Sequence, residues 1–316
     1  MFFCVSANPA IDKRMRAKQF RVGSVNRLLN VRPEPGGKAA HVALALTALG
    51  EQASWIGFAG GASGEELIEG LNAAGIRTNR VESRKPTRTN LAILDDDGIV
   101  TEILEPGGPI FPSELDLFRE ACERTFSEMK DQGLAIFSGS LPQGVPEDFY
   151  AKLICSARQA GCRTFVDTSG PALQFALEQR PDFVKPNKEE AEQLTGEAIT
   201  GVPEARKAVS QFLARGARSV ALSLGKDGLL WFPGAEEPAY RVRTPIVAAR
   251  SGVGSGDATV AGLVHAIARG LQPQETARLA AACGAANCLA VSPGRITLAD
   301  VEEMLKSTTV ERLDQP

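Results

Sequence analysis

Short apolar runs that alternate with helix-length amphipathic segments constrain this fold more than any other feature of the chain. Six runs are typical of buried strands, and they are Phe2–Ser6, Ser54–Phe58, Leu134–Phe137, Thr164–Val166, Phe183–Lys185 and Ser219–Leu224. The segments between them are typical of helices, and the clearest are Ala39–Leu49, Glu65–Ala74, Ser113–Lys130, Glu147–Ala160, Glu189–Leu194 and Pro203–Arg215. Because strands separated by helices usually pair in parallel, the sequence predicts an α/β fold with a mostly parallel central sheet and helices on both faces.

Two segments break this alternation and predict a small accessory β structure. Residues 12–32 are polar and rich in arginine. In residues 87–105, two apolar runs flank the turn Asp95–Gly98, and an Asp-Gly pair between apolar runs is typical of a hairpin. We expect a lid built from these two segments, because antiparallel pieces inserted into a parallel fold often form one. No linker or repeat interrupts the rest, and residues 1–316 are read as a single domain.

Charge and cysteine usage disfavour several classes of function. The 316 residues have a net charge of −3, whereas nucleic-acid binders usually carry a basic face, so no nucleic-acid partner is expected. Six cysteines without a C-x-x-C pair and only two histidines argue against a zinc site, and scattered thiols suit a reducing compartment. Neither a signal peptide nor an apolar run long enough to span a bilayer is evident. We therefore expect a cytoplasmic protein without a membrane partner.

The glycine-rich turn Ser251–Asp257, with the helical pattern Asp257–Ala268 directly after it, carries the strongest chemical signal. Its glycines allow several N–H groups to face one concavity, and the adjoining helix N-terminus adds partial positive charge, a combination that binds phosphate. Asp257 could take a proton from an attacking hydroxyl. The plainer alternative is a tight loop with an N-capping aspartate. The turn matches neither a Walker A loop nor the G-x-G-x-x-G fingerprint of dinucleotide-binding folds.

Other small, polar loops stand beside the predicted elements. Gly36-Gly37-Lys38 precedes a predicted helix, where Lys38 offers a point charge for an anion, although a turn with one exposed lysine is the plainer alternative. Arg88 opens the lid hairpin and could bind a phosphate, although a solvated arginine at a strand end is commoner. Four further loops follow predicted strands at the edge where open α/β sheets bind ligands, and they are Ser138–Pro142, Asp167–Gly170, Lys185–Asn187 and Ser223–Gly228.

In their order and spacing, these motifs resemble those of the PfkB (ribokinase-like) carbohydrate kinases over essentially the whole chain. The matching pieces are Asn8–Asp12, Val25–Arg27, Gly36–Lys38, Thr87–Asn90, Ser138–Pro142, Lys185–Asn187 with Glu190, Ser223–Gly225 and Gly254–Asp257. The sequence is most similar to the hexose-phosphate branch of that family. The resemblance implies a three-layer αβα ribokinase-like fold with a small β lid, ATP and Mg²⁺ as cofactors, and a homodimer formed through the lid.

The resemblance also implies roles for individual residues. Asp257 matches the catalytic base that deprotonates the sugar hydroxyl. The anion hole matches the backbone of Val253, Gly254, Ser255 and Gly256. Sugar contacts match Asp12, Gly36, Gly37 and Asn90, and the anchors of the phosphate already on the substrate match Lys38, Arg88 and Ser140.

The remaining implied roles concern the nucleotide and the metal. Glu190, together with Asn187, matches the element that organises Mg²⁺ through water. The nucleotide side matches Lys185, Asn187, Ser223, Gly225, Gly228, Gly252, Val253, Gly254 and Gly256. Asn287 matches the place where the adenine pocket closes.

One position departs from the pattern of the branch. After Gly37-Lys38 the branch usually has glycine, an apolar residue and asparagine, but this chain has Ala39, Ala40 and His41. His41 can hydrogen-bond a sugar in place of the asparagine, and its larger ring titrates near neutral pH. A helix-face histidine without ligand contact is the plainer alternative. The anion hole should tolerate Ser255, which replaces the usual alanine.

The leading interpretation is transfer of the ATP γ-phosphate to a ketohexose phosphate, with fructose 1-phosphate giving fructose 1,6-bisphosphate as the first expectation. Tagatose 6-phosphate and fructose 6-phosphate are alternative acceptors. A kinase of an unphosphorylated sugar or nucleoside would make Lys38 and Arg88 dispensable. A non-catalytic sugar-phosphate sensor is disfavoured by the presence of Asp257, Asn187 and Glu190, and a nicotinamide-dependent oxidoreductase is disfavoured by the glycine spacing.

Overall fold

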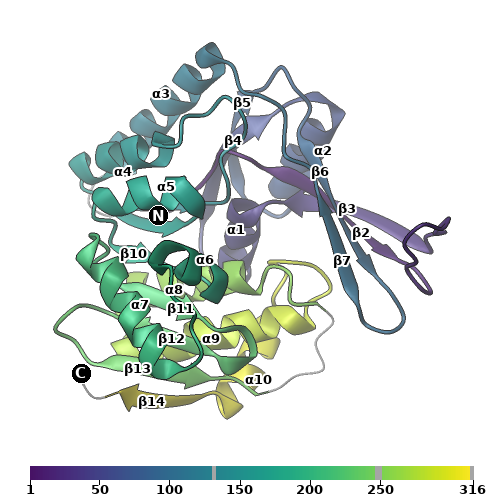
Figure 1. Cartoon of the computed structure of the whole chain (residues 1–316). Helices are drawn as coiled ribbons and strands as arrows, with labels where there is room; N and C mark the ends of the chain where they lie inside the picture. The colour runs from purple at the N-terminus through teal and green to yellow at the C-terminus, as the bar shows by residue number, and fades with distance from the viewer. Residues whose placement is uncertain (130–132, 246–250, 314–316) are drawn as a thin grey trace.

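The computed structural model describes residues 1–129, 133–245 and 251–313, and a ten-stranded sheet forms its centre (Figure 1). The strands lie in the order β14-β13-β12-β11-β10-β9-β8-β1-β4-β5. Their bounds are β1 Phe2–Ser6, β4 Ala53–Ala59, β5 Arg77–Glu82, β8 Leu134–Ser138, β9 Arg163–Asp167, β10 Phe183–Val184, β11 Val220–Ser223, β12 Leu229–Phe232, β13 Ala239–Arg243 and β14 Thr309–Leu313. In that order, the seven neighbouring strands from β11 through β1 to β5 pair in parallel, whereas β12, β13 and β14 extend the sheet with antiparallel pairs. The mostly parallel sheet predicted from the sequence is therefore confirmed.

Strand β1 shows why such short apolar runs form the middle of the sheet. All five of its residues are buried. Phe2 and Cys4 belong to the hydrophobic core on one face, whereas Phe3 and Val5 belong to the core on the other face. Because successive side chains of a strand point to opposite faces, a strand that is covered on both sides has to be apolar throughout.

Helices cover both faces of this sheet and complete three layers (Figure 1). One face packs against α1 (Lys38–Ala48), α2 (Gly61–Ala73), α8 (Ser255–Ala268), α9 (Pro273–Leu289) and α10 (Leu298–Ser307). The other face packs against α3 (Pro112–Met129), α4 (Phe149–Gln159), α5 (Gly170–Glu178), α6 (Lys188–Thr195) and α7 (Val202–Ala214). The predicted helices are confirmed within a few residues of their expected ends, except that Lys130 lies outside the described residues. Among those residues, no helix is long and apolar enough to cross a membrane.

A separate four-stranded sheet projects from the main body in Figure 1, and we call it the lid sheet. Its strands lie in the order β3-β2-β6-β7, with bounds β2 Ala10–Arg16, β3 Asn30–Gly36, β6 Arg88–Leu94 and β7 Val100–Leu104. The register places Asp12 of β2 opposite Asn90 of β6. The two segments that interrupt the βα alternation thus come together in one sheet. Alternate residues face opposite sides of it, so Asp12 and Arg14 share one face, and Met15 and Ile93 share the other.

Several elements were not anticipated from the sequence: β2, β3, β5, α5, α10 and the antiparallel strands β12, β13 and β14. Strand β3 contains Pro33 and Pro35, which argue against a strand in the middle of a sheet. It is an edge strand, paired only with β2, and the missing proline N–H groups are tolerated there. Strands β5 and β12 to β14 lie at or near the two ends of the sheet.

Candidate active site

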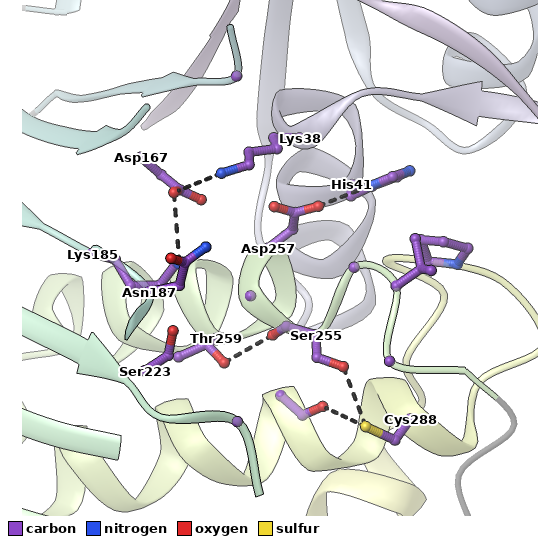
Figure 2. Close-up of a pocket in the computed structure, with 18 of the residues that line it drawn as sticks. Lys38, His41, Asp167, Lys185, Asn187, Ser223, Ser255, Asp257, Thr259 and Cys288 are labelled. Carbon is purple, nitrogen blue, oxygen red and sulfur yellow. Dashed lines mark hydrogen bonds and ion pairs between the residues drawn. The ribbon is translucent and has the colours of Figure 1, made fainter. Parts of the chain in front are cut away.

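A cavity of about 970 Å³ lies between the lid sheet, the ends of the parallel strands and the N-terminus of α8. Every residue predicted to bind or act on a ligand lines this cavity, except Gly36 and Asn287. Lys38, Asp167, Lys185, Asn187 and Asp257 lie near one another in Figure 2, although they come from distant parts of the sequence. Asp167, Lys185 and Asn187 meet because β9 and β10 are parallel and end at the same edge of the sheet, and the first turns of α1 and α8 bring Lys38 and Asp257 to that edge.

The glycine-rich turn ends in the N-terminus of α8, which begins at Ser255 rather than at Asp257. Gly254 is the N-cap and has a φ of 79°, a left-handed conformation that favours glycine. The Val253 N–H donates to Ser251 Oγ at 3.1 Å, and the Ser255 N–H donates to the Gly252 carbonyl at 3.2 Å. Within the described part of the chain, no acceptor is paired with the N–H groups of Gly254, Gly256 and Asp257. These three donors at a helix N-terminus can bind an anion.

Asn287 of α9 supports this turn from behind instead of lining the cavity. Its Nδ2 donates to the Val253 carbonyl at 2.8 Å, and its Oδ1 accepts from the Gly294 N–H at 2.8 Å. Pro293 packs against Gly254 so closely that a Cβ on Gly254 would lie 2.6 Å from the Pro293 Cβ. Asn287 was expected to close the adenine pocket. In the structure it does not line the cavity, and its polar atoms instead hold the backbone of the turn.

A chain of hydrogen bonds connects Asp257 to the lid sheet. Asp257 Oδ2 lies 2.8 Å from His41 Nδ1, and His41 Nε2 lies 2.9 Å from Asp12 Oδ2 (Figure 2 shows the first of these contacts). Asp12 Oδ1 accepts from Asn90 Nδ2 at 2.9 Å. The plainer alternative, in which Asp257 is the N-cap of the helix, is therefore wrong, because Gly254 is the N-cap. Gly36 belongs to the same region, because a Cβ there would lie 2.2 Å from Asp12 Oδ1.

The charged groups of this hydrogen-bonded series, Asp257, His41 and Asp12, stabilise one another. Burial would lower the pKa of His41, but the hydrogen bonds and charges of Asp12 and Asp257 outweigh it and raise the pKa to about 10. Burial would raise the pKa of Asp12, but His41 and Asn90 hold it below its ordinary value. Both shifts favour the charged forms, which are the imidazolium of His41 and the carboxylate of Asp12.

A second charged cluster surrounds Asp167, at the end of β9. Asp167 Oδ1 accepts from Lys38 Nζ at 3.0 Å and lies 3.6 Å from Lys185 Nζ, while Lys38 Nζ also lies 3.6 Å from Glu190 Oε1. Burial would raise the pKa of Asp167, but Lys185 and Lys38 lower it. Burial would lower the pKa of Lys38, but the carboxylates of Asp167, Glu190 and Asp257 raise it. Both shifts favour the charged forms of Asp167 and Lys38, and Lys38 points toward Asp167 rather than standing free in the cavity.

The sequence placed the loop Asp167–Gly170 at the ligand-binding edge of the sheet but gave Asp167 no role of its own. Its signal was its place directly after a buried strand, which it shares with Lys185 and Ser223. Asn187 and Glu190 carry a local signal that was also missed, since they form a capping box at the start of α6. Asn187 Oδ1 accepts from the Glu190 N–H at 2.7 Å, and Glu190 Oε2 accepts from the Asn187 N–H at 2.9 Å. Both residues still line the cavity.

The far end of the cavity contains Arg88 and Ser140. The guanidinium of Arg88 donates to the backbone carbonyls of Glu105 at 2.8 Å and Asn8 at 3.0 Å. Asn8, which sequence reasoning missed as a site residue, donates from Nδ2 to Ser140 Oγ at 3.1 Å. These contacts hold Arg88 and Ser140 at one end of the cavity, and the remaining N–H groups of Arg88 can bind an anion there.

The opposite end of the cavity contains the loop after β11 and part of α9. Ser223, Gly225 and Gly228 line it, as does Cys288. Ser255 Oγ lies 3.2 Å from Cys288 Sγ, so the hydroxyl that replaces the usual alanine has a partner on α9 (Figure 2). Ser223, Gly225 and Gly228 contribute little side-chain bulk to this part of the cavity.

The residues around Asp167 fit a magnesium ion bound chiefly through water and phosphate. No group of three or more metal-binding side chains occurs in the described residues, so the protein alone does not form a closed cage. Asp167 Oδ2 is buried and has no hydrogen-bond partner among these residues. Mg²⁺ is commonly bound by one or two carboxylates together with substrate phosphates, and Asp167 and Glu190 supply such a pair.

Comparisons with known proteins agree with this geometry. The sequence profile of the pfkB family carbohydrate kinases matches residues 5–298. A 1-phosphofructokinase from Rhodobacter capsulatus is 39% identical over 282 residues, which cover 88% of this chain and 87% of that protein.

Solved structures give the same result. Phosphofructokinase-2 from Escherichia coli in complex with fructose-6-phosphate has a TM-score of 0.87 and 29% identity, with 97% of this chain and 98% of that chain covered. A possible 1-phosphofructokinase from Thermotoga maritima has a TM-score of 0.87 and 27% identity, with 99% and 100% covered. The expected ribokinase-like fold is therefore confirmed.

Proposed function

Because the chain belongs to the pfkB family of carbohydrate kinases and is a phosphotransferase acting on a sugar hydroxyl, we propose that it transfers the γ-phosphate of ATP to a ketohexose phosphate. We propose fructose 1-phosphate as the preferred acceptor and fructose 1,6-bisphosphate as the product. The observation that carries the proposal is the position of Asp257, whose carboxylate lies on the first turn of α8, beside the N–H groups of Gly254 and Gly256, which have no acceptor among the described residues. The likeness to the Rhodobacter capsulatus protein supports the choice of acceptor.

Asp257 acts as the general base. Its Oδ2 is bonded to His41, which leaves Oδ1 for the acceptor hydroxyl. The hydroxyl oxygen attacks the γ-phosphorus, its proton passes to Asp257, and ADP leaves. The N–H groups of Gly254, Gly256 and Asp257 offset the negative charge that spreads over the transferring phosphoryl group.

The cluster around Asp167 serves the nucleotide side. Asp167 and Glu190 would hold Mg²⁺ through water, and when bound this ion neutralises charge on the ATP phosphates. Lys38 and Lys185 keep Asp167 ionised. Ser223, Gly225 and Gly228 line the end of the cavity where the nucleoside of ATP would lie.

The sugar would lie between the lid sheet and Asp257. Asn90 Oδ1 is buried and has no partner among the described residues, so it offers an acceptor for a sugar hydroxyl. Asp12 stands next to it, with Oδ1 bonded to Asn90 and Oδ2 bonded to His41. The phosphate of the acceptor would bind Arg88 and Ser140, because Lys38 is already paired with Asp167.

We expect Arg88→Ala to raise KM for the sugar phosphate by about 10- to 100-fold, since a charge-assisted hydrogen bond contributes about 1.5–3 kcal/mol. The effect on kcat is expected to be smaller, because a phosphate anchor remote from the reacting atoms mostly contributes uniform binding. Steady-state kinetics measures both constants. Arg16→Ala is the matched control, because Arg16 is an exposed lid arginine paired with Asp96. An Arg88→Ala enzyme with an unchanged KM would show that this arginine does not bind the phosphate.

A panel of acceptors tests the proposed function as a whole. Initial rates of ADP release with Mg-ATP are measured for fructose 1-phosphate, fructose 6-phosphate, tagatose 6-phosphate, free fructose, ribose and adenosine. The highest kcat/KM is expected for fructose 1-phosphate. Activity confined to the unphosphorylated compounds would contradict the proposal, as would ligand binding without any ADP.

We also propose a homodimer formed through the outer face of the lid sheet. That face, opposite the cavity, carries Val31 and Ile103, which are 50% and 49% exposed. Across the described residues, eight of the fourteen exposed large hydrophobic side chains belong to residues 22–31 or 99–104. An exposed apolar patch of this kind is typical of an interface.

All six cysteines are free, in keeping with the reducing cytoplasm in which we place the enzyme.

Light scattering coupled to size-exclusion chromatography tests the dimer. The wild-type chain is expected to elute with twice the chain mass of 33.5 kDa. Ile103→Lys is expected to shift it to the monomer, because the charge would be buried without a partner. Leu298→Lys is the matched control, since Leu298 is 54% exposed but lies on α10. A dimer that survives Ile103→Lys would place the interface elsewhere.

A further inference from the structure

His41 occupies an unusual position between two carboxylates. Its Nδ1 lies 2.8 Å from Asp257 Oδ2 and its Nε2 lies 2.9 Å from Asp12 Oδ2. The residue is 5% exposed. Both ring nitrogens are therefore occupied by protein oxygens, and neither is left to contact a sugar as expected from the sequence.

The partners of His41 dictate its charge. A carboxylate only accepts hydrogen bonds, whereas a neutral imidazole has one donor and one acceptor nitrogen. Two carboxylates at hydrogen-bond distance are therefore matched by an imidazolium, which donates from both nitrogens.

The surrounding charges agree with this protonation state. Lys38 of α1 acts on Asp257, Arg88 of β6 and Arg14 of β2 act on Asp12, and Glu102 of β7 interacts with both Asp12 and His41. The raised pKa of His41, about 10, follows from its hydrogen bonds and charge interactions with the two carboxylates despite its burial.

We propose that His41 is a positioning residue that, as an imidazolium, holds the base Asp257 and the sugar-binding Asp12 at a fixed separation and so aligns the base with the acceptor hydroxyl. The inference rests on the proposed function for the roles of the two carboxylates. His41 comes from α1, Asp257 from α8 and Asp12 from the lid sheet, so the imidazolium joins the three parts that meet around the sugar. Without it, Asp12 and Asp257 would each lose a charged hydrogen-bond donor.

Two substitutions separate the two contacts of His41. An asparagine carries its amide nitrogen about as far from Cα as Nδ1, so His41→Asn can keep the contact with Asp257 but loses the contact with Asp12. A glutamine reaches about as far as Nε2, so His41→Gln can keep Asp12 but loses Asp257.

The expected effects of these substitutions differ in kind. We expect His41→Gln to lower kcat by about 100-fold, because a misplaced reacting group costs about that much, with a smaller change in KM for the sugar phosphate. We expect His41→Asn to raise that KM about tenfold with a smaller loss of kcat, since it removes one hydrogen bond to a charged group. KM for ATP should stay unchanged in both variants. His265→Asn is the matched control, because the other histidine pairs with Glu51 away from the cavity.

The wild-type protein tests the protonation state without any substitution. The chain has two histidines. Nitrogen-15 NMR can therefore follow both rings, and His265→Asn assigns the signals. One ring, that of His41, is expected to keep imidazolium shifts at both nitrogens at pH 8 and to titrate near pH 10. Correspondingly, the wild-type kcat should fall as pH rises toward 10, and this fall should be absent from both His41 variants.

Stability gives a readout that applies even if a variant folds poorly. Because the pKa of His41 is raised from 6.5 to about 10, its contacts stabilise the folded state fully below about pH 6.5, and this contribution is lost as pH rises through 10. The difference in unfolding free energy between wild type and His41→Asn should therefore shrink between pH 7 and pH 10.

Two results would overturn the inference: a neutral His41 ring at pH 7 in the wild-type protein, or variants with wild-type kcat, KM and pH profile. If the wild-type protein phosphorylates none of the sugars tested, the proposed function fails, while the NMR titration still decides the state of His41.

Discussion

Asp257→Asn is expected to lower kcat by about 10²–10⁴-fold while leaving KM for both substrates within a few-fold of wild type. The amide has the shape of the carboxylate but cannot take the proton of the acceptor hydroxyl. Asp257 lies on the first turn of α8, and its Oδ1 has no partner among the described residues, so the substitution removes the base without disturbing a structural contact of that oxygen. Steady-state kinetics with fructose 1-phosphate and ATP measures the effect.

Asp116→Asn is the matched control for this loss, because Asp116 forms an exposed ion pair with Arg119 on α3, away from the cavity. It should keep the wild-type rate. An Asp257→Asn enzyme with a near-wild-type kcat would remove Asp257 as the base and, with it, the observation on which the proposed function depends.

Gly254→Ala is expected to lower kcat by about 10²–10³-fold, the loss typical of removing a donor from a site that stabilises developing negative charge. The φ of 79° at Gly254 is unfavourable for alanine by about 1–2 kcal/mol, and the new Cβ would lie 2.6 Å from the Cβ of Pro293. The turn must move to relieve this contact, and the N–H groups of Gly254 and Gly256 move with it.

Gly252→Ala tests the specificity of that effect within the same turn. A Cβ at Gly252 would meet no atom within 4 Å, and its φ is not in the left-handed range. Its kcat should fall far less than that of Gly254→Ala, and any loss should appear in KM for ATP, because Gly252 lines the cavity on the nucleotide side. Equal losses of kcat in both variants would mean that the turn tolerates no side chain anywhere and that Gly254 is not the critical backbone position.

The central layers of the fold could be predicted because their signals are local. Residues 2–6 are apolar throughout, as a strand buried on both faces requires, and the glycine-rich turn precedes a long helical pattern. Strand β3 could not be predicted in this way, because Pro33 and Pro35 are compatible with a strand only at the edge of a sheet, and edge position is a property of the tertiary structure.

The candidate site shows the same division. The order of its motifs identified Asp257, Lys38 and Arg88 as candidates, and all three line one cavity. The partner of each side chain was beyond prediction: Lys38 pairs with Asp167, which is 129 residues away, and His41 pairs with Asp257, which is 216 residues away. Such pairs depend on how α1, β9 and α8 pack together, and a local sequence pattern cannot predict that packing.

The most direct test of the central claim is to identify the product of the reaction with fructose 1-phosphate and Mg-ATP by phosphorus-31 NMR. The proposed function predicts equal amounts of ADP and fructose 1,6-bisphosphate, with no inorganic phosphate beyond the rate in the absence of sugar. Formation of ADP and inorganic phosphate without the bisphosphate, or no reaction while free ribose or adenosine is phosphorylated, would contradict it.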